Sequence, residues 1–415
     1  MAVLIAASVS FLFLSDEKLF TMVAVSCVVN FALAKVVSKR PKLLLPSIGL
    51  NVVALYFVER AEIFSGPFAF FPMAFLLLSV ANYLIEAADD PVGRSRDSVA
   101  EFVLYLIFFP KVLAGPIERP HAFIGASRSP EPRASVDYSK ALLLIAFGLF
   151  KKGVVADRVG AFIHPFFADP ERYANQPLFA WACTLLTYVY IYFSLSGYTD
   201  IARGAALGFG VRLSENFDRP FAASSPSDFW RRNHVSVSSW FKDFVFIPGA
   251  LMFEGKVARV LVLVATFAIC GLWHRMTPNF LVWGLFSGML VLGVHVVQTW
   301  APKFRLPSAV TLGLISVSCI FVFAQSLGDA VLVFGALVSF GSFGSVEPLT
   351  IVSPGWGLRD AVIVIAAVLA LLAIEPRSSS EGGRKSTRWL IAAMAFIAWS
   401  LLKHQPQRIF NYLNF

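Results

Sequence analysis

The sequence predicts an all-α, polytopic integral membrane protein, on three observations. Of its 415 residues, 57% are hydrophobic and 15% are charged, whereas soluble domains average about 25% charged residues. The mean hydropathy is +0.70. The apolar segments are continuous, without the alternation of apolar and polar residues found in membrane β-strands. We therefore expect roughly 10–12 membrane helices, with short re-entrant or interfacial helices among them.

The expected membrane segments are read from the apolar runs. The N-terminal run lacks a basic region and a cleavage site, so we interpret it as a first, short membrane segment and not as a signal peptide. Several runs are shorter than the ~20 residues of a straight span, which favours re-entrant or interfacial placement. The segment 328–345, rich in Gly and Ser, is a candidate interfacial helix. The other runs are 2–14, 19–37, 43–58, 67–86, 101–114, 139–165, 177–195, 257–273, 278–299, 307–326, 354–374 and 388–402.

Charge and cysteine content exclude other classes of protein. The net charge is +9, but Lys and Arg lie in short loops, which indicates contact with lipid headgroups and not with nucleic acid. The four cysteines lie in apolar runs without a CxxC pair, so we predict neither disulfides nor a metal site. No repeat is visible, and we expect one membrane domain, 1–415, with its motifs at about 101–300.

The region 196–253 breaks the apolar pattern. It is too polar for a lipid-facing span and too apolar for a solvated loop, so we expect short helices folded into the membrane core. Within it, Trp230, His234 and Phe241 share one face of a helix-period stretch. Ionisable residues at membrane depth are costly and therefore indicate a functional site.

Two histidines are candidates for catalysis. His274 ends the apolar run 257–273 and follows Trp273. A neutral imidazole in a low-dielectric cavity suits a general base, because it can accept a proton. His234 is either a second residue of the catalytic centre or a structural residue of an amphipathic helix. From the residues alone, this His, Arg and Trp cluster fits an enzyme or a transporter.

Several short motifs, in this order and spacing, resemble the membrane-bound O-acyltransferase family, in the bacterial branch typified by the alginate O-acetylation membrane subunit. They begin with Phe109 to Arg119 and Gly148 to Lys152. They continue with Ser196 to Ala202, Glu215 to Phe217, Asp228 to Arg232, His234, Trp240, Gly271 to His274 and Trp283 to Leu285. Two positions depart from the family pattern. Asn233 replaces a Trp, and Arg275 replaces a small residue, which places a positive charge beside His274.

The resemblance implies a tunnel through the membrane and an acyltransferase activity with no bound cofactor. The donor would be an acyl thioester, either acyl-CoA or acyl carrier protein. His274 would be the general base on the acceptor hydroxyl, and His234 would position the acceptor or stabilise charge. The pocket residues would be Trp273, Trp230 and Asn233, with Arg231 and Arg275 as further substrate-binding residues.

The resemblance also implies an acceptor and a location. We expect acetyl transfer to an exported polysaccharide or cell-envelope glycan in the bacterial cytoplasmic (inner) membrane, with a periplasmic or extracellular SGNH-type acyltransferase as a possible partner. One alternative is transfer of D-alanine to teichoic acid, or of a longer chain to a lipid or small metabolite. An alternative of another class is a transporter or flippase, which predicts inverted repeats. We find no such symmetry in the sequence.

Overall fold

The computed structural model of this chain describes residues 1–61, 70–89, 97–112, 115–128, 130, 132 and 135–339. Across these ranges the chain is helical, apart from turns and one antiparallel bridge between Phe217 and Asn233. The predicted all-α class is therefore confirmed for this part of the chain. The predicted segments 354–374 and 388–402 lie outside the described residues, as does the C-terminal end of the 328–345 segment.

Five of the described helices are long and apolar enough to cross a membrane. Other predicted segments form shorter helices, such as α1 (Ala2–Ser15) and α19 (Leu327–Val338), and these are too short for a straight span. The five are α2 (Glu17–Lys39), α3 with the turn before it (Pro41–Arg60), α11 (Pro177–Gly208), α15 (Lys256–His274) and α16 (Pro278–Trp300).

The remaining helices are shorter, apart from α4, and lie between or after these spans in the chain. A π-helical turn, Lys151–Ala156, joins α9 to α10, and another, Lys242–Phe246, joins α13 to α14. The helices are α4 (Phe70–Asp89), α6 (Val99–Ile107), α7 (Phe109–Val112), α8 (Pro120–Arg128), α9 (Tyr138–Phe150), α10 (Asp157–Ala168), α12 (Pro226–Arg232), α13 (Val235–Phe241), α14 (Ile247–Met252), α17 (Ser308–Ser318) and α18 (Ile320–Phe323).

Two predicted segments differ from the structure. The run 101–114 is not one helix, because α6 ends at Ile107 and α7 begins at Phe109. The cause is Pro110, which lacks an N–H and would clash with the preceding turn of a continuous helix. The residues 196–208 are not short helices, because they continue α11. Gly197 and Gly204 allow α11 to approach α9 closely, since a Cβ at Gly204 would meet the carbonyl oxygen of Ala141 at 2.6 Å.

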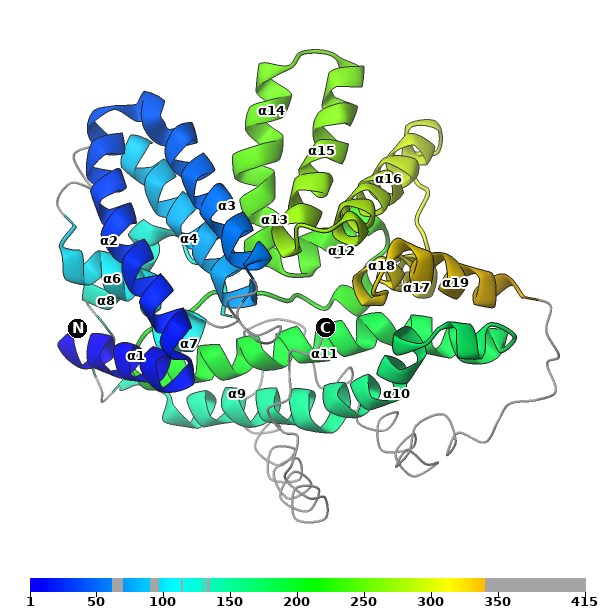
Figure 1. The fold of residues 1–415 in the computed structure, drawn as a ribbon, viewed down its shortest axis with the longest axis horizontal. Coiled ribbons are helices and arrows are strands. Elements are labelled where there is room, and N and C mark those ends of the chain that lie inside the picture. Colours follow the sequence, from blue (N-terminus) through cyan, green and yellow to red (C-terminus); the bar gives the residue numbers. More distant parts are fainter. Residues whose placement is uncertain are drawn as a thin grey trace. The chain divides into compact units, whose positions relative to one another are not determined.

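The chain divides into two compact units, and α9 and α11 contribute residues to both. The first contains Met1–Ile145 and Tyr198–Glu215. In it, α2 and α3 pack against α4, and α1 packs against α2 and α6, as the blue and cyan helices of Figure 1 show. Buried aromatic rings of Phe102, Tyr83 and Tyr105 form part of its core. The Oγ of Ser8 accepts the backbone N–H of Phe109 at 3.1 Å, which ties α1 to the start of α7.

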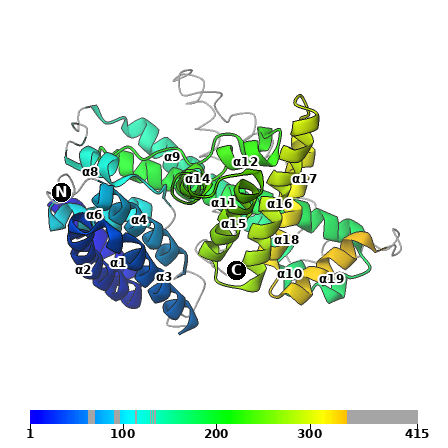
Figure 2. The same cartoon turned by 90° about the horizontal axis from the view of Figure 1, so that it is seen from above.

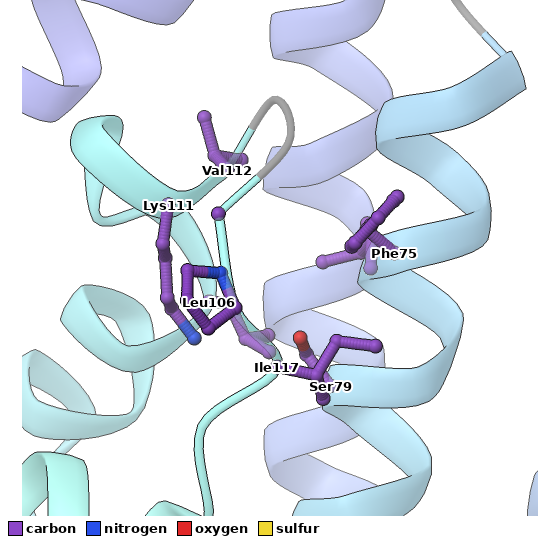
Figure 3. A pocket seen from close by; sticks show the side chains of 9 residues that line it. Phe75, Ser79, Leu106, Lys111, Val112 and Ile117 are labelled. Atoms are coloured by element: carbon purple, nitrogen blue, oxygen red, sulfur yellow. The ribbon is translucent and has the colours of Figure 1, made fainter. Parts of the chain in front are cut away.

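Residues 115–119 form an irregular segment after α7, and hydrogen bonds of Glu118 hold it in place. The hydroxyl of Tyr105 donates to the backbone carbonyl of Glu118 (3.0 Å), and the Glu118 carboxylate accepts the N–H of Ser214 (2.7 Å). Lys111 is buried, with its Nζ 3.9 Å from the centroid of the Tyr105 ring. Figure 3 shows the small pocket beside it, which is lined by Phe75, Leu76, Ser79, Leu106, Lys111, Val112, Gly115, Pro116 and Ile117.

The second unit contains Ala146–Gly197 and the described residues from Asn216 onward. Its central element is the hairpin of α15 and α16, which lie side by side in Figure 2. Gly271 and Gly284 permit this approach, because a Cβ at Gly271 would meet the carbonyl oxygen of Phe280 at 2.1 Å. Helix α12 packs on α16, and α13 packs on α12. This packing places the histidine-bearing segments in one unit.

Candidate active site

His234 lies at a break between two short helices. Helix α12 ends at Arg232, and α13 begins at Val235 with His234 as its N-cap. The expectation that Trp230, His234 and Phe241 share one face of a continuous helical stretch is therefore wrong. The φ of His234 is 51°, in the left-handed region, which costs roughly 1–3 kcal/mol for a residue other than Gly. Such backbone strain persists only where the surrounding contacts enforce it.

The segment that begins at Asn216 supplies those contacts. The N–H of Asp218 donates to the carbonyl of Arg232, and the N–H of Val235 donates to the carbonyl of Asn216, both at 2.8 Å. The side chain of Asn216 is buried, with its Nδ2 3.2 Å from Nδ1 of His234. His234 is itself buried, at 7% exposure. The backbone and side chain of Asn216 together hold the histidine in place.

His274 is the last residue of α15, and aromatic rings surround it. Its imidazole lies 4.5 Å from the ring of Trp273 and 5.1 Å from that of Trp283, in edge-to-face geometry. Phe280 stacks at 6.3 Å. Arg275 follows in extended conformation and is exposed. His274 as a whole is half-buried, and the surrounding rings form an apolar wall that orients the imidazole.

Ring contacts connect the two histidine-bearing segments. Trp230 of α12 lies 6.0 Å from Trp283, which also contacts His274. Phe241 of α13 lies 5.9 Å from Trp273. His234 lies between α12 and α13, the two helices whose aromatic side chains make these contacts. The structure therefore brings together four of the predicted residues, which are His274, His234, Trp273 and Trp230.

Trp283 is a site residue that the sequence analysis quoted only as part of a motif. Its side chain is buried, and among the described residues its Nε1 has no hydrogen-bond partner, as is also the case for the buried Nε1 atom of Trp230. A buried donor without a partner costs about 1–3 kcal/mol, so each needs an explanation. Two such indole N–H groups near His274 are candidates to donate to a bound substrate.

Asn233 is buried and engaged by the protein. Its Oδ1 accepts a hydrogen bond from the hydroxyl of Tyr188 in α11, at 3.0 Å. Tyr188 also packs edge-on against Phe229 of α12. Asn216 belongs to the Glu215 to Phe217 motif, but neither it nor Tyr188 could be predicted as a partner of the 233–234 break, because both contacts depend on how distant segments fold together.

Arg231 and Arg275, the two arginines predicted to bind substrate, both have exposed side chains. The side chain of Arg231 is 75% exposed and pairs with Asp228 at 3.2 Å. Arg232 pairs with the same carboxylate at 3.1 Å. The backbone N–H of Ser224 also donates to Asp228, at 3.1 Å. Asp228 therefore anchors this end of α12, and Arg231 and Arg275 are placed where they can meet solvent or a charged ligand.

The chemistry available here is that of uncharged donors and acceptors. Two imidazoles lie together with several aromatic walls and with the indole N–H groups of Trp230 and Trp283, which have no hydrogen-bond partner in the described part of the chain. Among the described residues, no group of three His, Cys, Asp or Glu side chains is arranged to hold a metal ion. The arrangement suits proton transfer and hydrogen bonding to a substrate in a largely apolar surrounding.

Comparison with known proteins gives a consistent result. A model of the membrane-bound O-acyltransferase family matches residues 10–336. A peptidoglycan O-acetyltransferase of Helicobacter pylori is 32% identical over 57% of this chain and 46% of its own length. A probable alginate O-acetylase of Pseudomonas syringae is 29% identical, over 73% of this chain and 58% of its own. A teichoic acid D-alanyltransferase of Bacillus subtilis is 25% identical, over 58% of this chain and 62% of its own. The chain thus spans about half the length of the first two relatives.

Proposed function

Because the chain belongs to the membrane-bound O-acyltransferase family, we propose that it transfers an acyl group from a thioester to a hydroxyl of an exported polysaccharide or cell-envelope glycan. The observation that carries the proposal is His274, which an aromatic wall orients at the end of α15, and which ring contacts connect to the α12 and α13 segment that carries His234. The acyl group is acetyl, since the relatives with 32% and 29% identity are named for O-acetyl transfer.

The proposed reaction uses His274 as general base. The imidazole accepts the proton of the acceptor hydroxyl as its oxygen attacks the thioester carbonyl carbon. The new C–O ester bond forms, the C–S bond breaks, and the proton passes from His274 to the departing thiolate. Trp273, Trp230 and Asn233 shape the pocket, and Arg231 and Arg275 contact charged parts of a substrate. A largely apolar surrounding limits hydrolysis of the thioester by water.

The donor and partners follow from the same chemistry. The donor is acyl-CoA or an acyl carrier protein, and the protein requires no bound cofactor. An SGNH-type acyltransferase outside the membrane is the proposed partner for completing transfer to the glycan. The protein would act in the bacterial cytoplasmic (inner) membrane.

Transfer of D-alanine is the second candidate. It is favoured by the similarity to the teichoic acid D-alanyltransferase. This reaction would use the same base and the same thioester chemistry, with a carrier protein as donor. The mass of the transferred group separates the two candidates.

The test is the analysis by mass of ester-linked acyl groups on cell-envelope glycans. Cells carry wild-type protein, His274→Ala or His295→Ala at equal abundance in the membrane. His295 lies on α16 and is exposed, so its variant is the control. We expect His274→Ala to lose one ester, because removal of a general base lowers the rate about 10²–10⁴-fold. An ester that persists unchanged in His274→Ala would contradict the proposal.

A further inference from the structure

The side chain of Asn216 has one orientation that satisfies its neighbours. Its Oδ1 lies 2.9 Å from the backbone N of Ser236 and 2.9 Å from the hydroxyl of the same residue. A backbone N–H can only donate, so the atom facing it must be an acceptor. The amide oxygen is thereby identified, and the amide nitrogen faces His234.

The orientation of Asn216 determines which nitrogen of His234 carries the proton. Nδ2 of Asn216 lies 3.2 Å from Nδ1 of His234, and an amide nitrogen donates but does not accept. Nδ1 must therefore accept this hydrogen bond, so the single proton of the neutral ring is on Nε2.

The backbone around His234 keeps its imidazole ring in contact with Asn216. The φ of 51° at His234 is held by the Asn216 carbonyl, which accepts the N–H of Val235 at 2.8 Å. Asn216 is 1% exposed and His234 is 7% exposed. Both the position of the ring and its tautomer are therefore set by the same residue.

We propose that Asn216 is a positioning residue that holds His234 in the Nε2–H tautomer, so that His234 donates a hydrogen bond to an oxygen of the reacting substrate and is not the base. This inference rests on the proposed acyl transfer, and it assigns hydrogen-bond donation to His234 and proton acceptance to His274. In attack on a thioester, negative charge develops on the carbonyl oxygen, and a preoriented N–H stabilises that charge. His274 then remains the proton acceptor.

The first test reads the tautomer without any turnover. Full-length protein with ¹⁵N-labelled histidine, in lipid nanodiscs, is studied by solid-state NMR, and His234 is assigned by the signals absent from His234→Asn. We expect an unprotonated Nδ1 and a protonated Nε2. Asn216→Asp presents oxygens only, so we expect Nδ1 to become protonated. A protonated Nδ1 in the wild type, or no change in Asn216→Asp, would overturn the inference.

The second test separates donation from proton transfer. In His234→Gln an amide N–H replaces the ring Nε2–H but cannot accept a proton. We expect His234→Ala to lose about 10²–10³-fold in rate, as for loss of an oxyanion donor, and His234→Gln to retain at least about tenfold more activity than Ala. His274→Gln should be as inactive as His274→Ala. Equal loss in His234→Gln and His234→Ala, with both proteins folded, would refute the donor role. Full activity in His274→Gln would instead contradict the proposed function, and the tautomer measurement would still stand.

Discussion

The close contact of α15 and α16 allows a prediction that links packing to activity. Gly271 lies one turn before His274, and a Cβ added there would meet the carbonyl oxygen of Phe280 at 2.1 Å and its carbonyl carbon at 3.1 Å. Both atoms belong to the backbone, so no side chain can rotate away. An Ala at this position requires the two helices to separate.

The magnitude follows from that distance. The contact falls short of ordinary van der Waals separation by more than about 1 Å, and overpacking of this kind costs roughly 1–3 kcal/mol. Ala in place of Gly inside a helix stabilises the folded state by about 0.5–1 kcal/mol. Because this gain is smaller than the cost of overpacking, we expect Gly271→Ala to be less stable than wild type. Displacement of His274 from Trp283 by about 1 Å can lower the rate about 10²-fold.

Gly293→Ala on α16 is the matched control. A Cβ at Gly293 has nothing within 4 Å, so this variant gains the helix propensity without the clash. Thermal unfolding in detergent, followed by tryptophan fluorescence, should show Gly271→Ala melting several degrees below wild type and Gly293→Ala at or above it. Ester formation should fall only in Gly271→Ala. Equal melting temperatures and equal activity for the two variants would refute the packing argument.

Two further predictions concern the indole donors and an acidic network. Trp283→Phe keeps an aromatic ring but removes the Nε1–H, which has no partner among the described residues. We therefore expect this variant to lose at least about tenfold in activity. Trp240→Phe, the control, removes a donor that likewise has no partner there, and its activity in the same assay should stay close to wild type. The hydrogen bond from Arg128 lowers the pKa of Glu101 to about 2, so its stabilisation is complete above the ordinary pKa of about 4.3 and disappears as pH falls toward 2. Arg128→Met should therefore lower the melting temperature at pH 7, and the difference from wild type should shrink at pH 3. A difference that grows at low pH would contradict this assignment.

Much of the fold could be predicted from hydropathy because membrane helices bury continuous apolar surface. The runs 257–273 and 278–299 agree within a few residues with Lys256–His274 and Pro278–Trp300. The break at Phe108 was not predicted, although Pro110 gave a usable signal. The length of α11 was underestimated because Ser196 to Asp200 look polar, whereas a close approach to α9 buries much of that stretch.

The sequence by itself determined the class of the protein, the family and the two histidines, because hydropathy and local motifs are properties of short segments. Only the tertiary structure shows how His234 is held. The hydrogen bond of His234 with Asn216 and that of Asn233 with Tyr188 join residues 18 or more positions apart. The left-handed φ of His234 occurs at the same place. The same holds for Trp283, whose unpartnered N–H and contact with His274 arise when α15 and α16 pack through Gly271 and Gly284. The tautomer of His234, its backbone strain and the indole donor of Trp283 all depend on neighbours that are distant along the chain. Local sequence patterns therefore cannot predict them.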